Sequence, residues 1–316
     1  MKFLGRAIHF NESPAVKDHQ PSATAAVVAR NIVLIAATPR LSFLVPPAAG
    51  QIAGWLLTGC RGGEAFLRRA PRRWYQTWHR FYERSTIPGL ALHHALRKRY
   101  VEHLVRAGLA EGFEQVVVLG GGLDTLALRL HREFPAVNFV ELDHPATQQV
   151  KHSVIESRNL AGANLTLQAA NFVQQRLADV LAASPRFVPE SRTMFVCEGV
   201  LMYLSDAEVR QVFAAIREQP GSRTRFVFTF MEPDRNGTPA FKNSGWLVRR
   251  WLALNGEPFR WGAAAEEIEG FLRSCGFRCL ELATSETLRR NDLAGANLLA
   301  EVVAEGEDIC VCEPSD

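Results

Sequence analysis

Glycines and carboxylates are spaced along one stretch of the chain in a way that can hold a nucleoside. Gly120 and Gly122 follow a short apolar run, residues 116–119, whose β-branched side chains predict a strand buried on both faces. The next predicted strand carries Glu141 and leads to Asp143. Glycines let the main chain approach a ligand without interference from Cβ. A carboxylate at the end of the second strand can accept hydrogen bonds from both hydroxyls of a ribose.

The loop lacks features that a dinucleotide needs. Thr125 stands where a dinucleotide fingerprint has its third glycine, and Asp124 lies beside the start of the next predicted helix. A fixed negative charge there would repel a pyrophosphate. S-adenosylmethionine has a ribose and a sulfonium but no phosphate, so the loop favours this cofactor over a nicotinamide dinucleotide. A nicotinamide-linked oxidoreductase is the alternative.

Three motifs follow one another in a defined order. They are GGGLDT at the loop, FVELDHP with Lys151 downstream, and CEGVLMYL at residues 197–204. The chain resembles, most densely over residues 97–204, the leucine carboxyl methyltransferase family of S-adenosylmethionine-dependent O-methyltransferases. The resemblance implies an α/β fold of the class I methyltransferase type. Its Rossmann-like sheet would have seven strands, mostly parallel with an antiparallel last strand.

The resemblance also implies individual cofactor contacts. Arg97, with Arg99 as the second choice, would grip the methionyl carboxylate, because a planar guanidinium forms two parallel bonds to a carboxylate. Asn171 and Phe172 stand where relatives carry Asp and a large apolar residue beside the adenine, and we expect the loss of charge to weaken binding by at most about 1–2 kcal/mol. Glu198 would hold the methionyl ammonium or orient a water molecule beside it. The full predicted cofactor set is Arg97, Gly120, Gly122, Asp124, Asp143, Asn171, Phe172 and Glu198.

Alternating strands and helices must place these residues at one edge of a sheet. Ser22 predicts the N-cap of a helix over residues 22–38, and a helix over residues 90–107 leads into the first strand. Further strands are expected at residues 165–169, 193–197, 225–230, 278–282 and 297–304. We expect residues 1–20 to be a polar arm and the acidic tail after Gly306 to be frayed.

Two segments are expected to cover the site. Residues 1–87 would form an N-terminal helical arm and lid, and residues 88–316 the core, with a lid insertion at about residues 231–263. Long insertions over the carboxyl edge of such sheets form substrate walls. The predicted substrate-facing residues are Tyr203, Trp246, Arg250 and Arg260. His93, His94 and His144 are candidate bases, but the sequence assigns the role of base to none of them.

Residues 62–84 interleave arginines with aromatic side chains. This composition is found in surfaces that bind nucleic acid or other anionic partners, in lids over acidic or aromatic substrates, and in ordinary amphipathic helices. We favour the last interpretation, in which the aromatic side chains cover the core and the arginines face water.

The overall composition is that of a globular protein. The chain has 316 residues, 47% hydrophobic and 22% charged, and its net charge of +3 is too small to indicate a nucleic-acid partner. The six cysteines have no zinc spacing, so we expect no metal and reduced thiols in a cytoplasmic protein. Prolines 39, 46 and 47 interrupt the apolar residues 24–59, which argues against a membrane span, and no signal peptide is evident.

These features predict an O-methyltransferase that acts on a carboxylate or hydroxyl of a small molecule, in secondary metabolism. Because the methyl group of a sulfonium is already activated, the protein must mainly align the acceptor and exclude water. Two alternatives remain open. One is a methyltransferase acting on a protein carboxylate, and the other is a non-catalytic binding protein of the same fold. The sequence does not indicate an oligomeric state.

Overall fold

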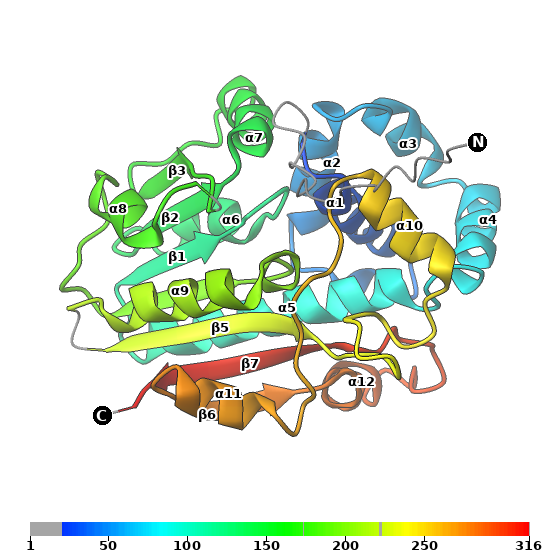
Figure 1. The fold of residues 1–316 in the computed structure, drawn as a ribbon. Helices are drawn as coiled ribbons and strands as arrows, with labels where there is room; N and C mark the ends of the chain where they lie inside the picture. Colours follow the sequence, from blue (N-terminus) through cyan, green and yellow to red (C-terminus); the bar gives the residue numbers. More distant parts are fainter. Residues whose placement is uncertain (1–20, 173, 221–222, 316) are drawn as a thin grey trace, which may run out of the picture.

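The computed structural model describes residues 21–172, 174–220 and 223–315, so the arm expected at residues 1–20 lies outside the described residues. The strands are β1 (Gln115–Leu119), β2 (Asn138–Asp143), β3 (Leu165–Ala169), β4 (Thr193–Cys197), β5 (Thr224–Met231), β6 (Phe277–Ala283) and β7 (Glu307–Pro314). They form a seven-stranded sheet in the order β3-β2-β1-β4-β5-β7-β6 (Figure 1). Strands β1 to β5 pair in parallel, and β7 pairs antiparallel with both β5 and β6. The predicted fold class is confirmed.

Helices cover both faces of this sheet (Figure 1). Before β1 come α1 (Ala23–Ala36), η1 (Ser42–Leu44), α2 (Ala49–Thr58), α3 (Gly63–Arg69), α4 (Arg73–Arg84) and α5 (Leu90–Ala110). Between β1 and β5 lie α6 (Leu126–Glu133), α7 (Pro145–Ser157), α8 (Leu177–Ala182), η2 (Leu201–Tyr203) and α9 (Asp206–Arg217). After β5 follow α10 (Trp246–Leu254), α11 (Ile268–Ser274) and α12 (Ser285–Leu293). In the part of the chain that the structure describes, no helix is both long and apolar enough to cross a membrane.

The core follows from the alternation of side chains along each strand. In β1, Val116 and Val118 pack into one cluster with α1, α2, α5 and α6, whereas Val117 and Leu119 pack into a second cluster with α8, α9 and α11. Burying each such side chain stabilises the fold by roughly 1.5–3 kcal/mol. The helix start predicted at Ser22 is confirmed, since Ser22 accepts a hydrogen bond from Ala25 N, and Ser205 forms a capping box with Glu208 at the start of α9.

The C-terminal part of the sheet differs from the prediction. The strand expected at residues 297–304 is wrong, because these residues connect α12 to β7 as a loop. The frayed tail is also wrong, since the residues after Gly306 form β7 between β5 and β6. The apolar residues Ile309, Cys310, Val311 and Cys312 are buried there. Carboxylates flank this apolar run on both sides, at residues 307, 308 and 313. The acidic composition of the segment therefore concealed a buried strand.

Helix α4 is also oriented against the prediction. Its aromatic side chains Trp74, Trp78 and Phe81 are exposed, and only half-buried residues face the protein. The favoured interpretation, in which these aromatic side chains cover the core, is therefore wrong for Trp74, Trp78, Phe81 and Tyr82, whereas Tyr75 packs against the core. The division of the chain at residue 87 stays a prediction, and α1 packs directly against α5 across it.

Candidate cofactor site

The loop after β1 requires glycine at each of its three positions. Gly120 and Gly122 have φ angles of 69° and 52°, in the left-handed region that favours glycine. A Cβ on Gly120 would stand 2.3 Å from Cγ2 of Val200, and one on Gly121 would stand 2.4 Å from the carboxyl carbon of Glu141. The loop is therefore pressed against both the FVELDHP motif and the CEGVLMYL motif.

Asp143 fixes the loop at the end of β2. Its carboxylate accepts hydrogen bonds from the main-chain N–H of Gly122 and, at 2.5 Å, of His144. Burial raises the pKa of Asp143, while these two donors act in the opposite direction. The carboxylate predicted to meet the ribose thus lies directly beside a loop glycine that is predicted to approach the cofactor.

Glu141 and Lys151 form an ion pair beneath the loop. Lys151 Nζ lies 2.6 Å from Glu141 Oε1, and the side chains are 0% and 1% exposed. Burial raises the pKa of Glu141 to about 7, although the lysine opposes the shift. Glu141 Oε2 is buried and has no hydrogen-bond partner among the described residues. A buried carboxylate of this kind is costly unless it is paired, so the lysine holds the base of the loop in place.

Arg97 lies at the centre of a buried charge network. Its side chain is 4% exposed, Nε donates to Glu198 Oε1 at 2.7 Å, and Nη1 donates to Glu307 Oε2 at 2.5 Å. Burial opposes the positive charge, but both carboxylates raise the pKa of Arg97. The third nitrogen, Nη2, stands 3.5 Å from the position that a Cβ on Gly199 would take. The glycine of the CEGVLMYL motif therefore leaves the guanidinium open on that side.

Lys98 links this network to the glycine loop. Its Nζ lies 3.2 Å from Glu198 Oε1 and 3.1 Å from Asp124 Oδ1. Asp124 also accepts from the main-chain N–H of Thr125 and so caps the start of α6. Burial opposes its ionisation, but Lys98 and Lys151 lower the pKa of Asp124 to about 2. The predicted contact residues Asp124 and Glu198 are thus brought together by one ammonium group.

The histidines near this network are already engaged. His93 Nε2 lies 2.9 Å from Glu307 Oε2, and His94 Nδ1 lies 2.9 Å from Asn31 Nδ2. Burial, together with the neighbouring Arg97, lowers the pKa of His94 well below its ordinary value. His144 caps the start of α7. The positions of His93 and His94 therefore match a structural role better than that of a base that meets the acceptor.

The start of α1 lies over the glycine loop. A Cβ on Gly122 would stand 3.1 Å from Cβ of Ala25. The carboxylate of Glu257, in the segment between β5 and α11, accepts from the main-chain N–H of Ala23 at 3.1 Å and of Thr24 at 3.0 Å. These hydrogen bonds join the start of α1 to a segment 234 residues further along the chain, and they hold the start of α1 over the glycine loop as a roof.

The remaining predicted cofactor and substrate residues lie outside the network of Arg97, Glu198 and Glu307. Asn171 and Phe172 follow β3 and are half-buried, with Asn171 N donating to Gln175 Oε1 at 2.9 Å. Tyr203 is half-buried, and its ring centroid lies 5.6 Å from that of Phe259. Arg260 lies close to Tyr203 through its main chain, because its N–H donates to the main-chain oxygen of Met202 at 2.7 Å. Trp246 and Arg250 are exposed, and Arg260 pairs with Glu208 at 3.4 Å.

Sequence reasoning missed three residues of this site. Glu307 was not predicted as a site residue because the last strand was expected at residues 297–304, whereas it begins at Glu307. Lys98 lies between Arg97 and Arg99, the two residues predicted to bind the methionyl carboxylate. Arg99 turns away from the site and pairs with Asp292 at 2.7 Å. Glu257 stands in the insertion without a motif around it.

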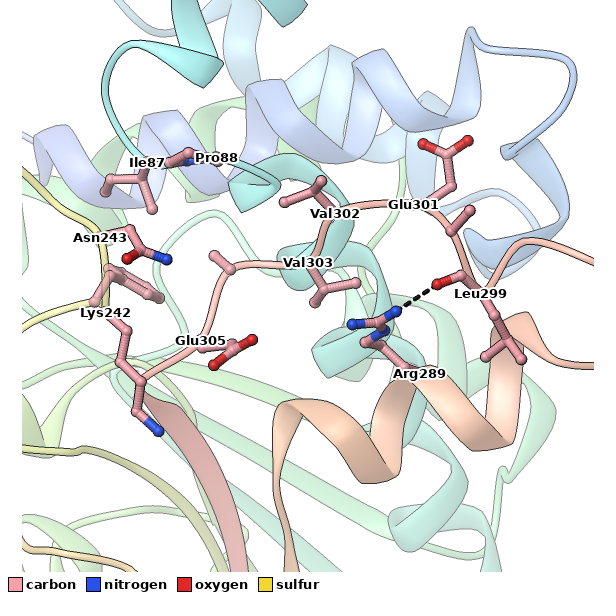
Figure 2. Close-up of a pocket in the computed structure, with 13 residues that line it drawn as sticks. Ile87, Pro88, Lys242, Asn243, Arg289, Leu299, Glu301, Val302, Val303 and Glu305 are labelled. Atoms are coloured by element: carbon pink, nitrogen blue, oxygen red, sulfur yellow. Dashed lines mark hydrogen bonds between the residues drawn. The ribbon is translucent and has the colours of Figure 1, made fainter.

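A hollow in the surface lies away from the glycine loop and the charge network. It has a volume of about 200 Å³, and its wall includes Ile87, Lys242, Arg289 and Val303 (Figure 2). Arg289 donates there to the main-chain oxygen of Leu299. None of the predicted cofactor residues lines this hollow.

The loop and network fit S-adenosylmethionine. The carboxylates of the network are Asp124, Glu198 and Glu307, and they meet the cations Arg97 and Lys98 and the imidazole of His93. The carboxylates exceed the cations by one charge, which suits a ligand carrying a sulfonium and opposes a pyrophosphate. Gly120 and Gly121 allow the loop to pack directly against Val200 and Glu141, which fixes its position beside these groups. Carboxylates beside the loop and a guanidinium beside Glu198 are the groups that a ribose and a methionyl moiety require.

Comparison with known proteins agrees with this geometry. The chain is 27% identical over 205 residues to a Bacillus subtilis protein provisionally named the S-adenosyl-L-methionine-dependent methyltransferase YktD, covering 64% of this chain and 65% of that protein. A Mycobacteroides abscessus protein with the same provisional description is 33% identical over 141 residues, covering 44% of this chain and 45% of its own length. The chain thus matches between about half and two thirds of the length of these relatives.

A solved structure and a family model extend the comparison. The solved structure of a Thermobifida fusca protein, provisionally described as a methyltransferase, shares the fold with a TM-score of 0.56 and 17% identity, covering 83% of this chain and 94% of that one. The model of the leucine carboxyl methyltransferase family matches residues 54–217, which include the glycine loop, Asp143 and Glu198. The chain belongs to the leucine carboxyl methyltransferase family.

Proposed function

We propose that this protein uses S-adenosylmethionine to methylate a carboxylate or hydroxyl oxygen of a small molecule. Membership of the family supports the use of this cofactor. The single observation that carries the proposal is the buried pair of Arg97 and Glu198, 2.7 Å apart beside the glycine loop. A guanidinium and a carboxylate held together in this way complement the two charges of an amino-acid moiety.

Each predicted contact has a defined part in the proposal. Bound S-adenosylmethionine supplies a methyl group that its sulfonium has already activated. Asp143 would accept the ribose hydroxyls, Arg97 would bind the methionyl carboxylate and Glu198 the ammonium. Asn171 and Phe172 would border the adenine. The start of α1, held by Glu257, would exclude water from the reacting atoms.

The surroundings of the site favour an acceptor that is already ionised. His93 and His94 are buried and bonded to Glu307 and Asn31. Burial raises the pKa of Tyr203, so this phenol stays protonated at neutral pH, although a hydrogen bond from Thr24 acts in the other direction. A carboxylate acceptor needs no base at neutral pH. We therefore rank small carboxylic acids above alcohols.

The roof also supports a small acceptor over a protein. Glu257 joins the insertion to the start of α1 directly above the loop, where a protein chain end would need an open groove. A methyltransferase acting on a protein carboxylate is the second candidate, and a non-catalytic binding protein is the third.

Transfer of radiolabelled methyl from S-adenosylmethionine tests the three candidates. The acceptors are a panel of small carboxylic acids, a panel of phenols and a peptide with a C-terminal leucine. Label that mild alkali releases as methanol identifies an ester, whereas alkali-stable label identifies an ether. Transfer to a small molecule supports the proposal. Transfer to the peptide alone supports the second candidate, and cofactor binding without transfer to any acceptor supports the third.

A further inference from the structure

Helix α4 turns Tyr75 and the polar residues Gln76 and Glu83 toward the protein. Gln76 Nε2 donates to the main-chain oxygens of Ala37 at 3.1 Å and Ala70 at 3.0 Å. Glu83 Oε1 accepts from the main-chain N–H of Ala91 at 2.5 Å. These contacts fix the rotation of α4 about its axis. They determine which side chains face outward, and the arrangement is the reverse of an ordinary amphipathic surface helix.

The outward side of α4 is aromatic. Trp74, Trp78, Phe81 and Tyr82 are 60%, 52%, 71% and 53% exposed. Their spacing of three and four residues places them on one arc of the helix. Trp78 and Tyr82 stack with their ring centroids 5.7 Å apart and their planes 13° apart. A continuous exposed aromatic strip marks a surface that contacts something other than water.

The same surface is basic. Arg72, Arg73, Arg80 and Arg84 are exposed along α4 and at its start. The one carboxylate of the helix, Glu83, faces the protein and accepts from Ala91. The outward side of α4 therefore combines aromatic rings with positive charge and presents no negative charge of its own.

Helix α10 adds a second exposed apolar strip. Trp246, Leu247, Trp251 and Leu254 are 63%, 58%, 41% and 66% exposed, and Arg250 is exposed beside them. Figure 1 shows α10 and α4 on the same side of the molecule, the side that also carries α1 to α3. The chain has six tryptophans, and the four that are most exposed all belong to α4 and α10.

The chemistry of α4 distinguishes between possible partners. A second copy packed on this helix would bring arginine against arginine with no facing carboxylate, which is unfavourable. Nucleic acid would be attracted by the charge, but base stacking needs open ring faces, and Trp78 and Tyr82 already stack on one face of each other. Tryptophan and tyrosine rings concentrate at the interface between lipid and water, and arginine side chains reach from there to lipid phosphates. A short helix with aromatic and basic arcs is suited to lie in that interface.

We propose that α4, assisted by α10, is a docking surface for an anionic lipid membrane. The helix would lie in the plane of the membrane with Trp74, Trp78 and Phe81 among the headgroups. Arg73 and Arg80 would bind lipid phosphates. The binding is peripheral and reversible, and it strengthens with the fraction of anionic lipid.

Vesicle sedimentation tests this inference with the full chain. The probes are vesicles of phosphatidylcholine alone and of phosphatidylcholine with phosphatidylglycerol, at two salt concentrations. The first variant combines Trp74→Ala and Trp78→Ala, and the second combines Arg73→Glu and Arg80→Glu. Arg186→Glu, an exposed arginine after α8, is the matched charge control. Leu280→Ala, 41% exposed on β6, is the matched apolar control.

The proposal predicts binding to the anionic vesicles only, with a blue shift of tryptophan fluorescence and weakening in high salt. Each double variant should bind at least about tenfold more weakly, and both controls should bind normally. Equal binding by the α4 variants would overturn the proposal, as would no binding of the unchanged protein to anionic vesicles. Binding of a short oligonucleotide in place of vesicles, or self-association that the same variants abolish, would replace lipid with a different partner.

Discussion

The guanidinium of Arg97 lies 2.5 Å from the carboxylate of Glu307, which is 210 residues further along the chain. The contact joins α5 to the first residue of β7 at the edge of the sheet where β4 delivers Glu198. Glu307 is fully buried, and its pKa is held well below the ordinary value because Arg97 and His93 outweigh the effect of burial. It therefore remains charged and fixes the orientation of Arg97.

Replacing Glu307 with glutamine should weaken cofactor binding. Arg97 would lose a charge-assisted hydrogen bond of about 1.5–3 kcal/mol and some of its orientation, which predicts at least roughly a tenfold rise in the Kd for S-adenosylmethionine. Glu313→Gln is the control, because Glu313 is 7% exposed on the same strand but pairs with Arg225. Equal losses in the two variants, measured by calorimetry, would show that Glu307 acts only through the stability of β7.

Breaking the pair of Glu141 and Lys151 should destabilise the fold strongly. Lys151→Met leaves a buried carboxylate without its cation, and we expect a loss of about 3–5 kcal/mol in the free energy of unfolding at pH 8. The loss should shrink at pH 5, because Glu141 can then be neutral. The double variant Glu141→Leu with Lys151→Met should recover most of the stability. Urea unfolding measures all three proteins, and a double variant less stable than the single one would refute this account.

Removing the carboxylate of Glu257 should loosen the roof. Glu257→Ala deletes two hydrogen bonds to the start of α1, so the amides of Ala23 and Thr24 should exchange with deuterium faster. The KM for the cofactor should rise roughly tenfold. Glu266→Ala changes an exposed carboxylate in the neighbouring loop and serves as the control. Unchanged exchange at residues 23–25 would contradict the role of Glu257.

The stability of the protein should fall as the pH rises, in part because of Asp308. Burial and the neighbouring Glu232 raise the pKa of Asp308 to about 8 from an ordinary value of 3.8. Between these values the folded chain keeps a proton that the unfolded chain has released, so the free energy of unfolding decreases with increasing pH. Asp308→Asn removes the titrating group. The free energy of unfolding of this variant, relative to that of the unchanged protein, should therefore increase from pH 5 to pH 8.5. Asp179→Asn, at an exposed position, should show no such trend, and parallel pH profiles of all three proteins would rule the prediction out.

The parts of the fold that local patterns encode were predictable. The bounds of β3 and β4 match residues 165–169 and 193–197, because β4 is a short apolar run and β3 alternates apolar with polar residues. The glycine loop and Asp143 lie together as expected, since the carboxyl ends of neighbouring parallel strands meet at one edge. Two of the three motifs touch through Gly120 and Val200.

The parts that depend on tertiary contacts were not predictable. The partner of Arg97 on β7 could be recognised only once the antiparallel strand was in place. The direction in which α4 faces is set by hydrogen bonds of Gln76 and Glu83 to main-chain atoms of Ala37 and Ala91. The spacing of apolar residues along the sequence does not reveal these bonds. An amphipathic pattern specifies two faces of a helix but does not specify which face meets the protein.

Calorimetric titration of S-adenosylmethionine into the protein and into its Asp143→Ala variant tests the central claim most directly. NAD serves as the competing ligand and Asp179→Ala as the matched control at an exposed position. We expect micromolar binding of S-adenosylmethionine to the unchanged protein and to the control, at least a tenfold loss of affinity in Asp143→Ala, and no binding of NAD. Binding of NAD, or equal binding of S-adenosylmethionine by a folded Asp143→Ala variant, would contradict the assignment of this loop.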